Sequence, residues 1–162
     1  MSAERRCSLA KVLVVYASKW GNTKIVAETI IEGIGGTPGM ETTIKNVNEV
    51  DFDRAVEYDA VLIGSPNHAG SATAGIKKII SRLGKLQFKG KGIAFFDTYI
   101  AKGFETAVKK MEKQAGEKLL GVELIAPGLS VKVKGLQGPI ADGELPKCKE
   151  FGARVAAKLT NS

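Results

Sequence analysis

The sequence predicts an α/β protein with a doubly wound, five-stranded parallel sheet that carries helices on both faces. Short apolar, β-branched runs, such as KVLVVYA at 11–17, are typical of strands buried on both faces of such a sheet. Amphipathic segments alternate with these runs roughly every 15 residues, which favours right-handed βαβ crossovers. Neither a linker nor a repeat interrupts this pattern. We therefore expect one domain over residues 1–162, with 1–9 as a flexible N-terminus.

The individual elements follow from the apolar pattern in chain order. Strands are expected at 11–17, 41–47, 60–64, 92–96 and 122–126, the fifth being broken at Pro127-Gly128 and resumed at 129–133. A first helix should begin at residue 22 and end at the glycines 33, 35 and 36. Four helical apolar faces are predicted: Ile25, Val26, Ile30 and Ile31; Ala72, Ile76, Ile79, Ile80 and Leu83; Phe104, Ala107, Val108, Met111 and Ala115; Cys148, Phe151, Val155 and Leu159. Pro146 suits the first turn of the last helix.

Composition excludes several classes of protein. With 44% apolar and 25% charged residues, the chain is neither disordered nor fibrous. Its longest apolar run, at 12–17, is far shorter than the roughly 20 residues that a membrane span needs, and its start lacks a secretory pattern. Two cysteines and one histidine argue against a disulfide framework or a protein-held metal centre. We expect a cytoplasmic protein with no membrane partner and no metal.

The charge is distributed unevenly along the chain. Residues 1–64 hold 7 Lys and Arg against 9 Asp and Glu, whereas residues 65–162 hold 17 against 8, which gives balances of −2 and +9. Much of the excess lies between residues 77 and 113. This basic region is either a solvated lysine face or a docking field for an acidic partner or an anionic substrate. A nucleic-acid partner is disfavoured, because aromatic residues do not interleave with the lysines and no nucleic-acid-binding motif is present.

Three loops should carry the chemistry, because ligands of doubly wound sheets bind beyond the carboxyl ends of the strands. The first loop consists of Ser18, Lys19, Trp20, Gly21, Asn22 and Thr23, and it runs directly into a helix. Hydroxyls, an amide and free backbone N–H groups at a helix start favour an anion. The loop matches neither G-x-G-x-x-G nor a Walker loop, so a terminal phosphate suits it better than a pyrophosphate. The alternative is that Ser18 or Asn22 only caps the helix.

The strand followed by S-x-x-G-N-T resembles the phosphate-binding loop of flavodoxins, with Trp20 where a hydroxyl is usual. The second loop is similar to the flavodoxin stretch that contacts the flavin ring. In that resemblance the ring contacts are Ser65, Pro66, Asn67, His68, Ala69 and Gly70. His68 stands where many flavodoxins have a large side chain that covers the ring. The alternative is an ordinary turn at Pro66-Asn67 with an exposed His68.

The third loop, 96–103, corresponds to a flavodoxin loop that often stacks a tyrosine on the flavin. By this resemblance Tyr99 is the stacking residue and Asp97 and Thr98 meet the pyrimidine edge of the ring. An acid there would lower the second reduction potential of the flavin by charge repulsion. A turn that caps the helix from Gly103 is the competing interpretation. The resemblance extends to the interrupted strand near 127–133 and to 138–145, so it covers nearly the whole chain.

The flavodoxin-like resemblance implies strand order 2-1-3-4-5 and a protein that binds FMN and carries electrons to a redox partner, here an acidic one. The flavin would cycle between oxidised, semiquinone and hydroquinone forms, with no residue acting as a catalyst. The alternatives are an FMN-dependent NAD(P)H:quinone or flavin reductase and a scaffold that has lost its cofactor. A phosphorylated receiver domain is disfavoured, because Ser18-Lys19 stands where its acids would be.

Overall fold

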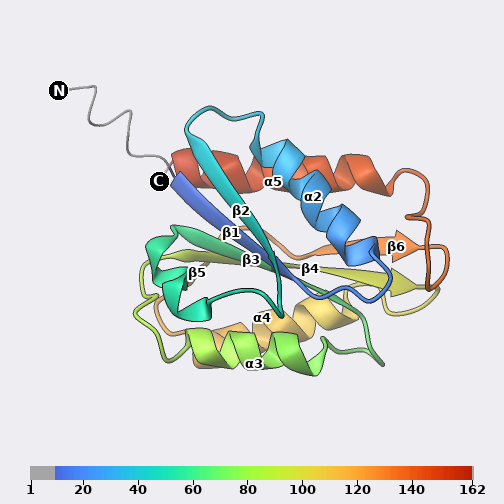
Figure 1. Ribbon diagram of the computed structural model, residues 1–162, viewed down its shortest axis with the longest axis horizontal. Helices are drawn as coiled ribbons and strands as arrows, with labels where there is room; N and C mark the ends of the chain where they lie inside the picture. Colours follow the sequence, from blue (N-terminus) through green and yellow to red (C-terminus); the bar gives the residue numbers. More distant parts are fainter. Residues whose placement is uncertain (1–9, 162) are drawn as a thin grey trace.

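The computed structural model describes residues 10–161, which form a parallel sheet between two layers of helices (Figure 1). The predicted start at 1–9 lies outside the described residues. The sheet has the order β2-β1-β3-β4-β5, with β6 also paired to β4, so the expected order 2-1-3-4-5 is confirmed. Its strands are β1 Ala10–Tyr16, β2 Met40–Asn46, β3 Ala60–Pro66, β4 Gly92–Ile100, β5 Glu123–Leu124 and β6 Leu129–Val133. The order reverses beside β1, so the switch point lies between β1 and β3.

Two pairs of helices cover the two faces of the sheet. The helices are α2 Asn22–Ile34, α3 Ala74–Leu83, α4 Thr106–Lys118 and α5 Glu144–Thr160. A 3₁₀ helix, η1, spans Phe52–Glu57 between two strands, where the apolar pattern predicted no element. Figure 1 shows α3 and α4 on one side of the sheet and α2 and α5 on the other. None of the helices within 10–161 is long and apolar enough to cross a membrane.

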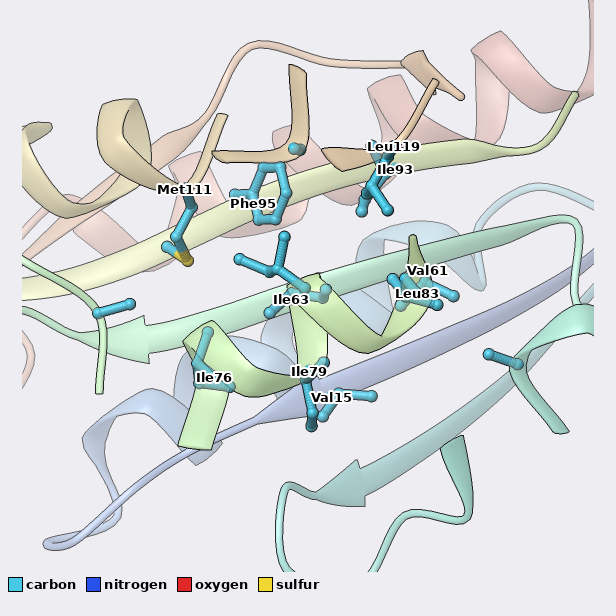
Figure 2. Close-up of a cluster of buried hydrophobic side chains, with 14 of the residues drawn as sticks. Val15, Val61, Ile63, Ile76, Ile79, Leu83, Ile93, Phe95, Met111 and Leu119 are labelled. Carbon is cyan, nitrogen blue, oxygen red and sulfur yellow. The ribbon is translucent and has the colours of Figure 1, made fainter. Parts of the chain in front are cut away.

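Each face of the sheet has its own core, because successive strand residues point to opposite sides. Leu13 and Val15 of β1 pack toward α3 and α4, and Figure 2 shows Val15 with other side chains of this cluster. Val12 and Val14 pack toward α2 and α5. All four are buried, as the apolar run of the first strand predicts.

Helices α2 and α5 approach each other through glycines. A Cβ on Gly33 would collide with the backbone of Lys149, and one on Gly152 would collide with the backbone of Ile30. Gly33 lies inside α2, where its lack of a side chain allows α5 to come close. It does not end the helix as predicted, because α2 runs to Ile34 and is followed by Gly35.

The structure differs from the predicted apolar faces and element boundaries at three places. Ile25 is 43% exposed, and the buried face of α2 is completed by Thr23 and Ala27. Phe104 is also exposed, because α4 begins only at Thr106. The fifth strand is split as expected: β5 pairs with the start of β4 and β6 with its end. The predicted segment 122–126, however, shrinks to two strand residues.

Candidate functional site

A pocket of about 600 Å³ opens at the carboxyl ends of β1, β3 and β4, beside the switch point. Its volume is that of an ordinary small-molecule or cofactor site. Thirteen of the sixteen predicted site residues line it: Ser18, Lys19, Trp20, Asn22, Thr23, Pro66, Asn67, His68, Ala69, Gly70, Thr98, Tyr99 and Gly103. The three predicted loops therefore do converge on one site.

The first loop presents the start of α2 to the pocket. Gly21, in the left-handed conformation, precedes the helix and makes no side-chain cap, so the first-turn N–H groups lack the usual partner. The Gly21 N–H itself donates to Ser18 Oγ at 2.9 Å, which shapes the loop from within. Ser18 neither caps α2 nor loses its own proton in this bond, so its hydroxyl can still donate to a ligand. Uncapped N–H groups and the helix dipole together favour an anion.

A buried pair of hydroxyls joins the first loop to β4. Thr23 Oγ1 lies 3.0 Å from Thr98 Oγ1, and both side chains are almost fully buried at the pocket wall. Each hydroxyl carries one proton, and the hydrogen bond between the two oxygens uses only one of these two protons. The second proton is therefore available to an acceptor in the pocket.

Asn67 holds the second loop against the turn that follows β4. Its Nδ2 donates to Gly103 O at 3.0 Å and to Thr106 Oγ1 at 2.6 Å, while its Oδ1 accepts from the Gly70 N–H at 2.7 Å. Gly103 has φ +103°, and a side chain there would collide with Asn67 Nδ2. Asn67 therefore fixes the shape of the pocket with its side-chain amide, and little of that amide is left to bind a ligand.

The tip of the second loop is a tight reversal at the mouth of the pocket. The backbones of His68 and Ser71 exchange hydrogen bonds of 2.7 and 3.0 Å. Between them, Ala69 and Gly70 both have positive φ, at 51° and 85°. A non-glycine residue in this region is strained, and such strain gathers at functional sites. The His68 side chain is exposed beside the pocket, as the turn interpretation also expected.

Much of the predicted third loop is strand. β4 continues to Ile100, and the turn that follows holds Ala101 and Glu105 at positive φ. Tyr99 lines the pocket and meets the Phe104 ring edge to face, with centroids 5.7 Å apart. Burial, with the Glu144 carboxylate nearby, raises the pKa of the Tyr99 phenol. The ring is therefore neutral and held in place, as a stacking surface requires.

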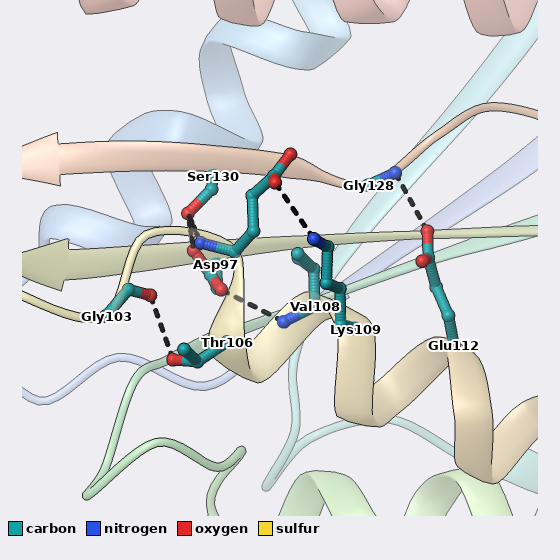
Figure 3. A network of polar contacts seen from close by, with 9 residues as sticks. Asp97, Gly103, Thr106, Val108, Lys109, Glu112, Gly128 and Ser130 are labelled. Carbon is teal, nitrogen blue, oxygen red and sulfur yellow. Dashed lines mark hydrogen bonds and ion pairs between the residues drawn. The ribbon is translucent and has the colours of Figure 1, made fainter.

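The expectation that Asp97 meets a ligand is wrong for this pocket. Because β4 extends past Asp97, that residue and Thr98 point to opposite faces of the sheet. Asp97 is fully buried toward α4, where it accepts from Ser130 Oγ at 2.6 Å and from the Val108 N–H at 3.0 Å (Figure 3). Burial raises the pKa of its carboxyl to about 6, although both hydrogen bonds favour the carboxylate.

Two further predicted residues shape the site without lining it. Ser65 is buried, and its Oγ accepts from the Thr73 N–H at 3.0 Å and donates to Pro66 O at 2.8 Å. Gly21 acts through the loop geometry described above. Neither residue is among those that surround the pocket.

A fourth loop, after β6, was missed by the sequence reasoning. Asn22 Nδ2 donates to Leu136 O at 2.9 Å, which draws this loop over the first one. From the end of β6 and the loop behind it, three residues that were not predicted line the pocket: Val133, Gly135 and Leu136. Three more come from the end of β4 and the segment up to α4: Ile100, Lys102 and Thr106. The rule that pointed to the first three loops also applies here, because β6 is parallel and ends at the same edge.

The pocket combines an anion site with a region lined by aromatic and apolar groups. The start of α2 and the threonine pair form the polar end, while Trp20, Tyr99 and the 66–70 loop supply apolar and backbone walls. These residues fit a planar aromatic group that ends in a phosphate. No cluster of three or more His, Cys, Asp or Glu within 10–161 could hold a metal. Burial raises the pKa of the Cys148 thiol to about 12, so that sulfur stays protonated.

Comparisons with known proteins agree with this architecture. A family model described as flavodoxin domain matches residues 13–123. A flavodoxin from the domain Archaea is 28% identical over 93% of this chain and 99% of its own, with a TM-score of 0.79. Flavodoxin 2 from Bacillus cereus is 26% identical over 92% and 99%, with a TM-score of 0.77. The Flv1 flavodiiron core from Synechocystis, at 23% identity, covers 98% of this chain and 38% of its own with a TM-score of 0.78, which shows the fold alone.

Proposed function

The chain belongs to the flavodoxin family, and from this premise we propose that its pocket holds FMN as the working group of an electron carrier. As a member of this family, the protein is an FMN-binding electron-transfer protein. The cofactor supplies the redox chemistry, and the chain supplies binding, orientation and control of access. One observation carries the assignment to this pocket: an uncapped helix start and an aromatic wall face the same cavity of about 600 Å³.

The residues divide the work along the length of the pocket. The first-turn N–H groups of α2, with Ser18 and the Thr23–Thr98 pair, would bind the phosphate. Tyr99 would pack against the ring, and the peptides of 66–70 would face its polar edge. Trp20 replaces a hydroxyl donor with an indole that is 47% exposed, so it covers the pocket more than it binds phosphate.

A comparison of FMN with riboflavin tests the phosphate end. Thr23→Val removes one hydroxyl and should weaken FMN binding about tenfold to a hundredfold, the value of one hydrogen bond to a charged group. The affinity for riboflavin, which lacks the phosphate, should stay nearly unchanged. Thr42→Val on β2 is the matched control, since Thr42 does not line the pocket. Equal losses for both flavins would mean that Thr23 only supports the fold, and failure of the native protein to bind either flavin would refute the assignment.

We propose the carrier over a reductase, because the chain is similar over nearly its whole length to flavodoxins that it also covers almost completely. An anaerobic reductive titration of the loaded protein should proceed in two one-electron steps. Steady NAD(P)H oxidation in the presence of a quinone would instead identify a reductase. The cytoplasmic location is likewise a proposal, which cell fractionation tests.

We also propose that the redox partner is acidic, which the net charge of +7 supports. Attraction between opposite charges speeds encounter more than it tightens the complex, and salt screens it. The rate of electron transfer to such a partner should therefore fall as salt is added. A rate that rises with salt would contradict the proposal.

A further inference from the structure

The positive charge of the protein gathers on one layer of helices. Helix α3 carries three cationic residues and no acid, and α4 carries four cations and two acids, which gives this layer +5. Helix α2 carries one cation and two acids, and α5 carries four and two, which gives the opposite layer only +1. The excess therefore marks one face of the molecule, the one formed by α3 and α4 (Figure 1).

This face is hollowed between its two helices. A groove of about 550 Å³ is lined by Lys77, Lys78, Ser81, Arg82, Lys85 and Gln114. Gln114 Nε2 donates to Lys77 O at 3.0 Å and to Ser81 Oγ at 3.1 Å, so α3 and α4 are tied together across it. The groove therefore has a fixed floor with a cationic rim.

Most of the rim cations have no counter-charge. Arg82 pairs with Asp53 at 2.8 Å, whereas Lys77, Lys78 and Lys85 make no ion pair within residues 10–161. Of the acids on α4, Glu112 is engaged on the other side of the helix, where it accepts the Gly128 N–H at 2.9 Å. Crowded like charges repel one another, so a surface of opposite sign would be drawn to this face.

The same face reaches the edge of the cofactor pocket. Lys110 Nζ of α4 lies 3.5 Å from the position that a Cβ on Gly70 would occupy. Gly70 belongs to the loop that lines the pocket beside His68. A body seated on the α3–α4 groove would therefore extend to the mouth of the pocket at 68–70.

We propose that the groove between α3 and α4 is the docking surface for an acidic protein, which it places at the 68–70 edge of the cofactor pocket. This inference rests on the proposed function and adds the location of the partner. An acidic protein surface fits better than a single-stranded nucleic acid, because the groove is lined by cations and small polar residues without the aromatic side chains on which bases stack. The carboxylates of the partner would replace the missing counter-charges of the rim.

Two charge-reversed double variants test this location. Lys78→Glu/Lys85→Glu reverses two cations that line the groove, and Lys45→Glu/Lys89→Glu makes the same change in net charge at residues that do not line it. The probe is labelled poly-L-glutamate, titrated at low salt into the FMN-loaded protein of residues 1–162. The groove variant should bind it about tenfold more weakly and the control less than twofold, because local complementarity outweighs net charge. FMN affinity should be the same in all three proteins.

The outcomes distinguish failure of the proposed docking surface from failure of the proposed FMN-binding function. Equal weakening in both variants would overturn the docking surface, since only net charge would then matter. A DNA duplex that binds the groove more tightly than poly-L-glutamate at equal salt would also overturn it, in favour of a nucleic acid. A native protein that takes up no FMN would refute the proposed function instead. Intact FMN binding with selective loss in the groove variant supports both.

Discussion

Replacing Asp97 by asparagine should change how stability depends on pH. The native carboxyl is fully buried and its pKa is raised from 3.8 to about 6, so ionisation is easier in the unfolded chain than in the folded one. Such a group favours folding most below the unfolded pKa, and this advantage is lost as pH rises through the folded pKa. The shift corresponds to about 3 kcal/mol, at roughly 1.4 kcal/mol per pH unit.

The asparagine variant should lack this slope. Its amide can occupy the same space, donate to Ser130 Oγ and accept from the Val108 N–H, as the neutral acid would. Urea unfolding of both proteins, in the same cofactor state from pH 4 to 7.5, measures the difference in free energy of unfolding. That difference should move in favour of the variant by about 2.5 kcal/mol over this range. Asp142→Asn is the control, because the Asp142 side chain is 97% exposed.

A flat difference between native and Asp97→Asn proteins would refute the reasoning. It would mean that the two hydrogen bonds compensate burial fully, so that the carboxyl of Asp97 has the same pKa in the folded and in the unfolded chain. An Asp97→Asn variant that is less stable relative to the native protein at pH 7.5 than at pH 4 would refute the reasoning more strongly. In that case the carboxylate would bind Ser130 and the Val108 N–H better than the neutral amide does.

Three further predictions concern packing, loop shape and a second acid. Gly152→Ala should lower the free energy of unfolding in urea by about 2 kcal/mol or more, because the added Cβ would collide with the backbone of α2. Gly116→Ala on α4, where a Cβ meets no atom, should raise that free energy by about 0.5–1 kcal/mol. Equal effects of the two substitutions would contradict the close contact between α2 and α5. Asn67→Ala should weaken FMN and riboflavin alike, because it frees the 67–70 loop from Gly103; a loss confined to FMN would contradict this. Burial opposes ionisation of Glu144, but the Lys132 N–H and the Lys147 ammonium outweigh burial and lower the pKa of its carboxyl. Glu144→Gln should therefore destabilise the protein most above pH 4.5 and less as the pH falls. A loss of unfolding free energy that grows as the pH falls would refute this prediction.

The sequence was sufficient for the sheet and for most of the pocket. Apolar runs located the strands because parallel strands are buried on both faces, and the strand-end rule located three loops. It failed where tertiary contacts override local pattern. Thr23 is buried because it meets Thr98, so the face of α2 turns away from Ile25.

The third loop shows why polar residues misled the prediction. The stretch Asp97-Thr98-Tyr99 resembles a turn, yet it continues β4 because β3 also extends and pairs Ser65 with Asp97. Only the true end of the strand decides which side chains face the pocket, and that end depends on the neighbouring strand. The loop after β6 was missed because its tie to Asn22 spans 114 residues and leaves no local signal.

The glycine contact between α2 and α5 also bears on how the protein is made. Helix α2, which begins at the proposed phosphate site, leaves the ribosome well before α5, since more than 100 residues separate Ile34 from Glu144. Its tightest neighbour is therefore absent until more than 100 further residues have been made, and such distant contacts form late and slowly. The nascent chain should thus acquire a cofactor only after α5 has been synthesised and has docked.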